Sequence, residues 1–146
     1  MKLPEYVTHE EVRRVCKELR IRDWTKLKKP QVSLKEAKII LSHVNTENMK
    51  TSLEDFKAGL EVELEHGTMF KPFNVTNNHP ILTGKIVMAH FMETLDYYKR
   101  LEIAEVEGDL MKAVVSKNME KIQKYYKKLT KAKIELGRAE AGQLTK

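Results

Sequence analysis

Apolar side chains recur at intervals of three and four residues along most of the chain, which is the periodicity of amphipathic helices. At three places a serine or threonine precedes an acidic residue by three positions, which is the signature of a helix N-terminus. These signals and the apolar stripes behind them predict helices over about 8–20, 33–45 and 52–67. Between the first two, a basic stretch with Trp24 and Leu27 predicts a short connector helix.

The second half of the chain predicts a long loop followed by two long helices. Residues 67–79 have no helical period and contain glycine, proline and asparagine, so we expect an ordered loop longer than is usual in a compact domain. Pro80 suits the first turn of a helix, and the apolar pattern behind it predicts a helix to Gly108. That helix is apolar on two sides, as the central helix of a bundle is.

A last, basic helix is predicted over about 109–137, and it carries an apolar seam. Most members of the seam alternate at spacings of four and three: Val115, Met119, Ile122, Tyr126, Leu129 and Leu136. Such a seam packs inside a bundle or against a second copy of the chain, which would form a homo-oligomer. No segment alternates at period two for long. We therefore expect one all-α domain over residues 1–146, a helical bundle of four long helices plus the connector.

Composition narrows the class of protein. A chain of 146 residues has the length of one domain, and its single cysteine, Cys16, excludes a disulfide framework and a cysteine-rich zinc site. Cys16 lies on the apolar stripe of the first predicted helix, which favours a buried thiol over a nucleophile. No stretch approaches the roughly 20 apolar residues of a membrane span. We expect a cytoplasmic protein.

The charges are distributed unevenly along a chain whose net charge is +6. Residues 1–50 contain 12 basic and 7 acidic side chains, residues 51–110 contain 5 and 11, and residues 111–146 contain 10 and 3. Five lysines of the last predicted helix recur at helical spacing and should share one side: Lys117, Lys121, Lys124, Lys128 and Lys131. This stripe is either a solvated face or a contact surface for an acidic protein or nucleic acid.

Two pairs of glutamate and histidine, each three residues apart, predict a candidate metal site between two helices. Residues at that spacing share one helical face. Together the pairs would supply two nitrogen and two oxygen ligands, a set suited to Zn, Fe or Mn, from Glu63, His66, His90 and Glu93. Tyr97 and Asp96 follow within one turn and would support these ligands from outside.

The alternative interpretation is a polar network with no metal. His90 lies about ten residues into its predicted helix, whereas His66 lies at the end of its own, so a tight antiparallel hairpin would keep the two rings apart. Only the long loop would let the two helices slide into register. The chain offers no pair of nucleophile and base and no glycine-rich phosphate loop, so an enzyme is not favoured. Asn77, Asn78 and His79 are explained more simply as helix capping than as an anion site.

A series of short motifs over about residues 52–102 resembles a family of small proteins of unknown function from microbes and their viruses. In order, the motifs are ELEHG, NVTN, a proline, TGKI, AH and DYY. The resemblance implies no activity. It implies that the region of interest is the third predicted helix, the loop and the fourth predicted helix, where His66, His90 and Asp96 lie on motif positions, and that the protein is cellular or virus-associated.

Two functions are therefore open. The first is a small helical binding protein with a Glu/His site for a divalent metal. The second is a structural or interaction module that uses the basic last helix and has neither metal nor catalysis.

Overall fold

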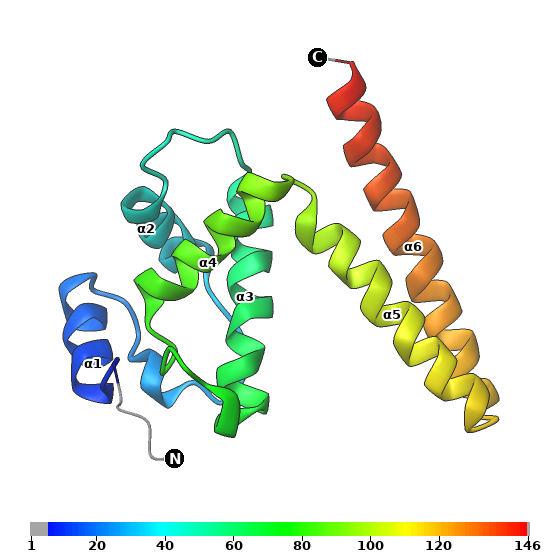
Figure 1. The fold of residues 1–146 in the computed structure, drawn as a ribbon, viewed down its shortest axis with the longest axis horizontal. Helices are drawn as coiled ribbons and strands as arrows, with labels where there is room; N and C mark the ends of the chain where they lie inside the picture. The colour runs from blue at the N-terminus through cyan, green and yellow to red at the C-terminus, as the bar shows by residue number, and fades with distance from the viewer. Residues whose placement is uncertain (1–5, 146) are drawn as a thin grey trace. The chain divides into compact units, whose positions relative to one another are not determined.

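A computed structural model describes residues 6–145 and confirms the all-α prediction, since these residues contain no β-strand (Figure 1). Six α-helices and two short 3₁₀ helices follow one another in the order α1 (His9–Glu18), η1 (Trp24–Lys26), α2 (Leu34–Val44), α3 (Leu53–Met69), η2 (Lys71–Phe73), α4 (Pro80–Glu93), α5 (Tyr97–Val115) and α6 (Met119–Leu144). The chain divides into two compact units, Met1–Glu93 and Thr94–Lys146. Within the described residues, no helix is long and apolar enough to span a membrane.

The three capping signals act as the sequence predicts. The side chains of Thr8, Ser33 and Ser52 each accept a hydrogen bond from the backbone N–H three residues further on, at the starts of α1, α2 and α3. At Ser33 the Glu36 carboxylate in turn accepts a hydrogen bond from the Ser33 backbone N–H, which completes a capping box. In the stretch predicted as a connector, the structure has the 3₁₀ helix η1.

In the first unit, α4 packs against α1, α2 and α3. The side chains of Ile40, Phe56, Leu60 and Val87 are fully buried between these helices. Gly84 lets α4 approach α2 closely, because a Cβ at this position would lie 2.7 Å from Cγ2 of Ile40. The glycine of the TGKI motif, Gly84, is therefore explained by the close packing of α4 on α2.

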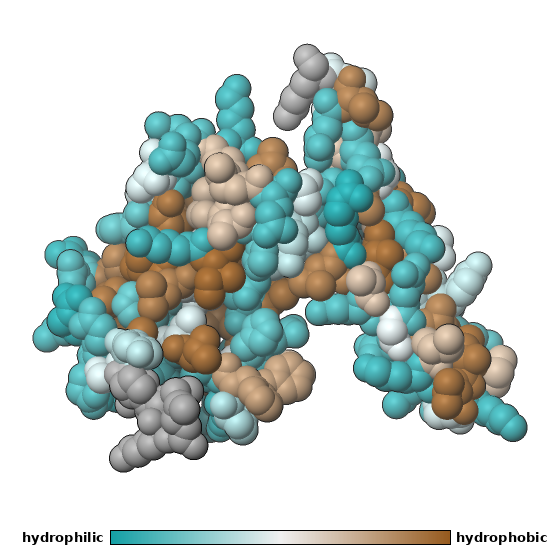
Figure 2. All heavy atoms as spheres, viewed as in Figure 1, coloured by the Kyte–Doolittle hydropathy of each residue, from teal (hydrophilic) through white to brown (hydrophobic). Residues whose placement is uncertain are grey.

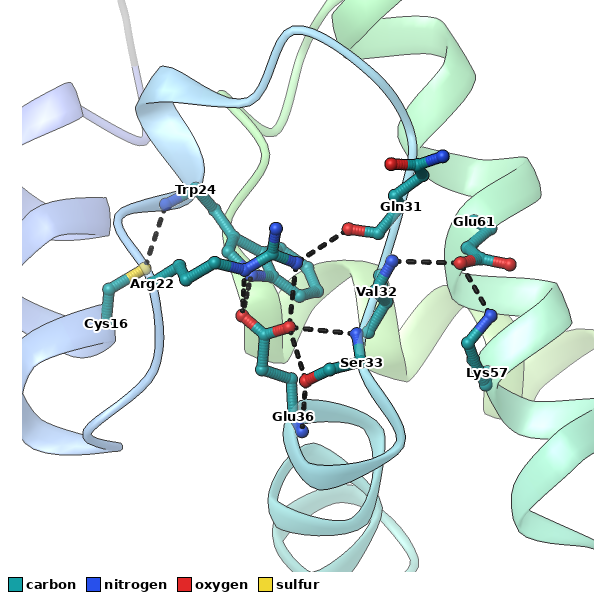
Figure 3. Close-up of polar contacts among 9 residues, drawn as sticks. All are labelled: Cys16, Arg22, Trp24, Gln31, Val32, Ser33, Glu36, Lys57 and Glu61. Atoms are coloured by element: carbon teal, nitrogen blue, oxygen red, sulfur yellow. Dashed lines mark hydrogen bonds and ion pairs between the residues drawn. The ribbon is translucent and has the colours of Figure 1, made fainter.

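A buried carboxylate joins the connector to α2 (Figure 3). Glu36 is 4% exposed and accepts hydrogen bonds from Nε and Nη2 of Arg22, at 2.9 and 2.8 Å, and from the indole Nε1 of Trp24. Trp24 is fully buried, and its backbone N–H donates to Sγ of Cys16. Cys16 is thus the buried thiol that the sequence predicts, and burial raises its pKa.

The segment between α3 and α4 is held by asparagine side chains. Asn78 is buried and donates from Nδ2 to the carbonyl oxygen of Trp24, and its Oδ1 accepts from Nδ2 of Asn74. Asn77 donates to the carbonyl oxygen of Val7. Asn77 and Asn78 both have positive φ angles, 48° and 60°, a conformation that asparagine tolerates better than most residues. Hydrogen bonds therefore fix the segment to the connector and to Val7.

Gly67 was predicted to end the third helix, and this is wrong, because α3 continues to Met69. The reason for a glycine is the segment that packs over it. A Cβ at Gly67 would lie 1.7 Å from Oδ1 of Asn78 and 2.7 Å from Nδ2 of Asn74. The glycine of ELEHG thus makes room for asparagines of the next motif.

His79 caps the start of α4. Its Nδ1 accepts from the backbone N–H groups of Ile81 and Leu82, at 3.2 and 3.3 Å. Nδ1 can accept only if it carries no proton, so the neutral ring is the capping form. Burial holds the pKa of His79 below its ordinary value of 6.5, although the carboxylate of Glu11 partly opposes this.

Acid is therefore expected to weaken the start of α4. Because the folded state lowers the pKa of His79, the unfolded chain binds this proton more readily, and the stabilisation is complete above about pH 6.5 and lost below it. A His79→Asn variant keeps a capping oxygen that does not titrate. Thermal melts at about pH 7 and about pH 5 should show a smaller fall in Tm for this variant than for the wild type. Equal falls in the two proteins would contradict this role of His79.

The second unit is a hairpin of α5 and α6. The two helices are joined by Ser116, Lys117 and Asn118, and Asn118 caps α6 by accepting from the backbone N–H of Lys121. Lys117 has a φ of 53° and ends α5 in the left-handed region. Val106, Ala113, Leu129 and Ala132 are buried in the hairpin.

The helix boundaries in this half differ from those predicted. The predicted helix 80–108 is interrupted at Thr94–Asp96, and the helix predicted from residue 109 is the end of α5 followed by α6. No proline or glycine marks either break. Asp96 and Asn118, side chains that bond to nearby groups, mark them instead, while Gly108 lies inside α5 in open space.

Candidate functional site

The structure brings the predicted glutamate and histidine pairs together in the first unit. Glu63 of α3 lies between two imidazoles: its Oε1 is 3.5 Å from Nε2 of His90, and its Oε2 is 3.9 Å from Nδ1 of His66. On the other side of His90, Nδ1 is 3.5 Å from Oε1 of Glu93. The four residues thus form a chain of contacts, which we call the Glu63 cluster. The segment between α3 and α4 is long enough to bring His90 level with the end of α3.

Within the Glu63 cluster the degree of burial differs strongly. The side chain of Glu63 is 12% exposed and that of His90 is 26% exposed, whereas those of His66 and Glu93 are both more than 60% exposed. Among residues 6–145, no group of three or more histidine, cysteine or acidic side chains has the arrangement of a metal site. As it stands, the Glu63 cluster is a polar connection between α3 and α4.

A small cavity opens beside the Glu63 cluster. Its volume is about 230 Å³, and its walls include Glu63, His66, Phe73, Val75 and Ile86. Phe73 and Val75 are 74% and 85% exposed, so the rim of this cavity is apolar. This cavity therefore opens the partly buried carboxylate of Glu63 to solvent.

Asp96 and Tyr97, predicted to support the metal ligands, belong to the second unit. The carboxylate of Asp96 is buried and accepts from Nε and Nη2 of Arg100 and from the hydroxyl of Thr94. The hydrogen bonds from Arg100 are the main cause that lowers its pKa. Arg100 also binds Glu140 of α6, at 2.7 Å. Asp96 therefore anchors the open end of the α5–α6 hairpin, and this role was not predicted.

The lysine stripe of the last predicted helix is partly rearranged. Lys121, Lys124, Lys128 and Lys131 are exposed on α6, but Lys117 lies in the turn before the helix. Lys128 forms an ion pair with Glu102, and Lys131 forms one with Glu135. Of the lysines in residues 111–133, four make no ion pair with any residue of the described chain: Lys117, Lys121, Lys124 and Lys127. We call these four the unpaired lysines; Lys127 was not among the predicted ones.

The predicted apolar seam is only partly buried. Leu129 is buried and Ile122 and Leu136 are half-buried, but Tyr126 is 64% exposed, and Ala132 fills a buried position that the predicted seam did not include. The first two members of the seam, Val115 and Met119, are not packed in the hairpin. They are 76% and 64% exposed because they lie at the turn between the two helices.

Large apolar side chains gather at the turn of the α5–α6 hairpin. Figure 2 shows apolar residues at this end of the hairpin. The side chains concerned are between 49% and 76% exposed, and we call them the apolar tip: Met111, Val114, Val115 and Met119. Lys117 and Lys121 are close to these residues in the sequence. Val115 and Met119 belong to the predicted seam, because one helix was predicted across the turn that separates them, whereas Met111 and Val114 were not singled out from the sequence.

Comparison with models of protein families shows the family of this chain. The model of a family described as "Protein of unknown function (DUF5661)" matches residues 12–107, about two thirds of the chain. The chain belongs to this family. The match contains α2, α3 and α4, most of α1 and the first half of α5, and α6 lies outside it. This confirms the resemblance to a family of unknown function and extends it toward the N-terminus. No curated protein and no solved structure matches the chain.

Proposed function

We propose that the protein is a binding module whose α5–α6 hairpin contacts an acidic partner protein. The observation that carries this proposal is that two of the unpaired lysines, Lys117 and Lys121, lie at the turn of the hairpin within a few residues of the apolar tip. Residues 111–133 contain eight lysines and a single acidic residue, Glu120. Four of these lysines pair with acidic side chains, and the unpaired lysines carry the remaining excess of positive charge. Such an excess attracts an acidic partner over a distance of about one Debye length, roughly 8 Å at physiological salt.

The apolar tip favours a protein over a nucleic acid as the partner. Lysines alone would bind the phosphates of any nucleic acid, in a strongly salt-dependent way. Exposed aliphatic side chains gain about 25 cal/mol for each Å² of apolar surface that a partner buries, and a phosphate backbone offers little such surface. A partner with both acidic and apolar side chains would use the whole end of the hairpin.

Reversing two of the unpaired lysines is expected to weaken this binding. The variant combines Lys121→Glu and Lys124→Glu, and the probe is a random copolymer of glutamate and tyrosine, measured by calorimetry at fixed salt. We expect affinity to fall by about tenfold or more, because two attractive charges become repulsive. A matched control reverses Lys35 and Lys38, two exposed lysines of α2 in the first unit that form no ion pair with described residues, and should bind normally.

Two further arms of this experiment separate the kinds of partner. Replacing Val115 and Met119 by serine should weaken binding of the copolymer and leave binding of poly-glutamate unchanged, since only the copolymer has apolar side chains. Because both residues are exposed, the fold should not be affected. Tighter binding of a short DNA duplex than of the copolymer would contradict an acidic protein as the partner.

A second candidate function is the binding of a divalent metal, Zn, Fe or Mn, at the Glu63 cluster. It is favoured by one observation, that the oxygens of Glu63 lie near two imidazole rings from two helices. Zinc-ligand bonds are about 2.0–2.2 Å long, so the side chains would have to close around the ion. The two histidines and two glutamates would be the ligands.

Elemental analysis after incubation with Zn²⁺, Fe²⁺ or Mn²⁺ tests this second candidate. A metal site predicts near-stoichiometric metal in the wild type and its loss in both His66→Ala and His90→Ala. The control is His43→Ala, which removes an exposed histidine of α2 that bonds only to nearby groups of its own helix. A wild type that retains no metal would rule the site out and leave the proposal for the hairpin untouched.

A further inference from the structure

The first unit contains a second cavity, which shares Asn74 of its lining with the cavity beside Glu63. Its volume is about 390 Å³, within the range of small-molecule sites. Four parts of the chain supply its walls: the start of α1, the connector η1 with the residues after it, α3 with η2, and the asparagine segment before α4. We call it the lysine cavity, after Lys26, Lys28 and Lys71.

The charge of the lysine cavity is positive, and within residues 6–145 no acidic side chain lines it. Lys26 has a partner outside the lining, Asp23, whose Oδ2 is 3.4 Å away. Lys28 and Lys71 form no ion pair with any residue of the described part of the chain. They are 43 positions apart in sequence and belong to different walls of the same cavity. Two ammonium groups that share a cavity repel each other, and an anion between them would relieve this repulsion.

The floor of the lysine cavity is buried and held by hydrogen bonds, whereas its lysines are exposed. Gly67 and Asn78 are buried there, and Asn78 is held by its hydrogen bonds to Trp24 and Asn74. Asn74 uses its NH₂ group in this contact, and its side-chain oxygen remains available to accept from a hydroxyl or amine. The cavity thus combines cations at its rim with a fixed, neutral polar floor.

We propose that the lysine cavity binds a small phosphorylated molecule. Lysine binds a phosphate group as a point charge, and the ammonium groups of Lys28 and Lys71 match the double negative charge of a phosphate. The polar floor and the side chain of Leu27 would contact the uncharged remainder of the ligand. This site is separate from the α5–α6 hairpin and does not depend on the function proposed for it.

Calorimetric titration with inorganic phosphate, pyrophosphate, AMP and adenosine tests the proposal. We expect AMP and pyrophosphate to bind in the micromolar to millimolar range, and adenosine, which has no phosphate, not to bind. The variant Lys28→Glu with Lys71→Glu should weaken binding by about tenfold or more. The α2 control with Lys35→Glu and Lys38→Glu has the same net charge and should bind as the wild type does.

The outcomes separate a site from general attraction to a basic surface. Equal weakening in the cavity variant and the α2 control would overturn the proposal, and so would a lack of binding of all three phosphate compounds at millimolar concentration. Since the replaced lysines are exposed, both variants should keep the helical circular dichroism spectrum and the Tm of the wild type. The hairpin variant with Lys121→Glu and Lys124→Glu should bind AMP normally, so failure of either proposal leaves the other standing.

Discussion

Replacing Glu36 by glutamine is expected to destabilise the first unit by about 2–3 kcal/mol, because a buried carboxylate that accepts several hydrogen bonds is lost, while Arg22 is half exposed and stays solvated. The carboxylate of Glu36 accepts from Arg22, Ser33 and Trp24 (Figure 3), and an amide cannot accept from all of them. The NH₂ group of the glutamine would also face the guanidinium of Arg22. Chemical denaturation followed by circular dichroism measures the difference.

The same carboxylate predicts a specific acid sensitivity. Burial raises the pKa of Glu36, but the hydrogen bonds from Arg22, Ser33 and Trp24 outweigh it and lower the pKa from 4.5 to about 2. A lowered pKa stabilises the folded state above pH 4.5, and this contribution is lost as the pH falls from 4.5 toward 2. At about 1.4 kcal/mol for each pKa unit, it amounts to roughly 3 kcal/mol.

A surface glutamate provides the matched control for Glu36. Glu18 pairs with Arg14 at 2.7 Å, but its side chain is 68% exposed, and exposed pairs contribute about 0–1 kcal/mol. Glu18→Gln should therefore change stability little and lose as much stability as the wild type between pH 4.5 and pH 2. Glu36→Gln should lose less over the same range, because other carboxylates with lowered pKa values, such as Asp96, remain. A Glu36→Gln protein as stable as Glu18→Gln at neutral pH would contradict the importance of the buried network.

Substituting Gly67 by alanine is expected to cost about 3 kcal/mol or more, from overpacking together with broken buried hydrogen bonds. The new Cβ would occupy the place of Oδ1 of Asn78, so the asparagine must move. Moving it breaks its bonds to Asn74 and to the carbonyl oxygen of Trp24. Thermal melting of the purified variant measures the loss.

Gly108 offers a control for the same chemical change. It also lies inside a helix, but nothing is within 4 Å of a Cβ built there. Since alanine favours a helix over glycine by about 1 kcal/mol, Gly108→Ala should be neutral or slightly stabilising. If Gly67→Ala behaved like Gly108→Ala, the close packing of the asparagine segment on α3 would not be a constraint.

The starts of the helices could be predicted from sequence because their signals are local. Ser33 and Glu36 are three residues apart, and the capping box they form depends on no other part of the chain. The break at Thr94–Asp96 could not be predicted in this way. Its anchor, Asp96, is fixed by Arg100, which in turn binds Glu140, 40 positions further along the chain. No local pattern contains that information.

Of the candidate sites, the Glu63 cluster could be predicted from local spacing and the apolar tip could not. The spacing of Glu63 with His66, and of His90 with Glu93, identified side chains that the structure brings into contact, because residues three apart in a helix share a face. The apolar tip was missed for a different reason. Val115 and Met119 have the spacing of buried residues, and only the turn between them leaves them exposed. Periodicity identifies a face of a helix but not what covers it.

The two units differ in how far apart in sequence their contacting residues lie, and this difference affects the order in which the chain folds. The hairpin of α5 and α6 closes over only three residues, whereas the bond between Asn78 and Trp24 joins residues 54 positions apart. Longer loops cost more entropy to close, and local contacts form faster. The hairpin should thus form early and the asparagine segment late. Pulse-labelled amide hydrogens in α5 and α6 would then become protected from exchange before those of α4.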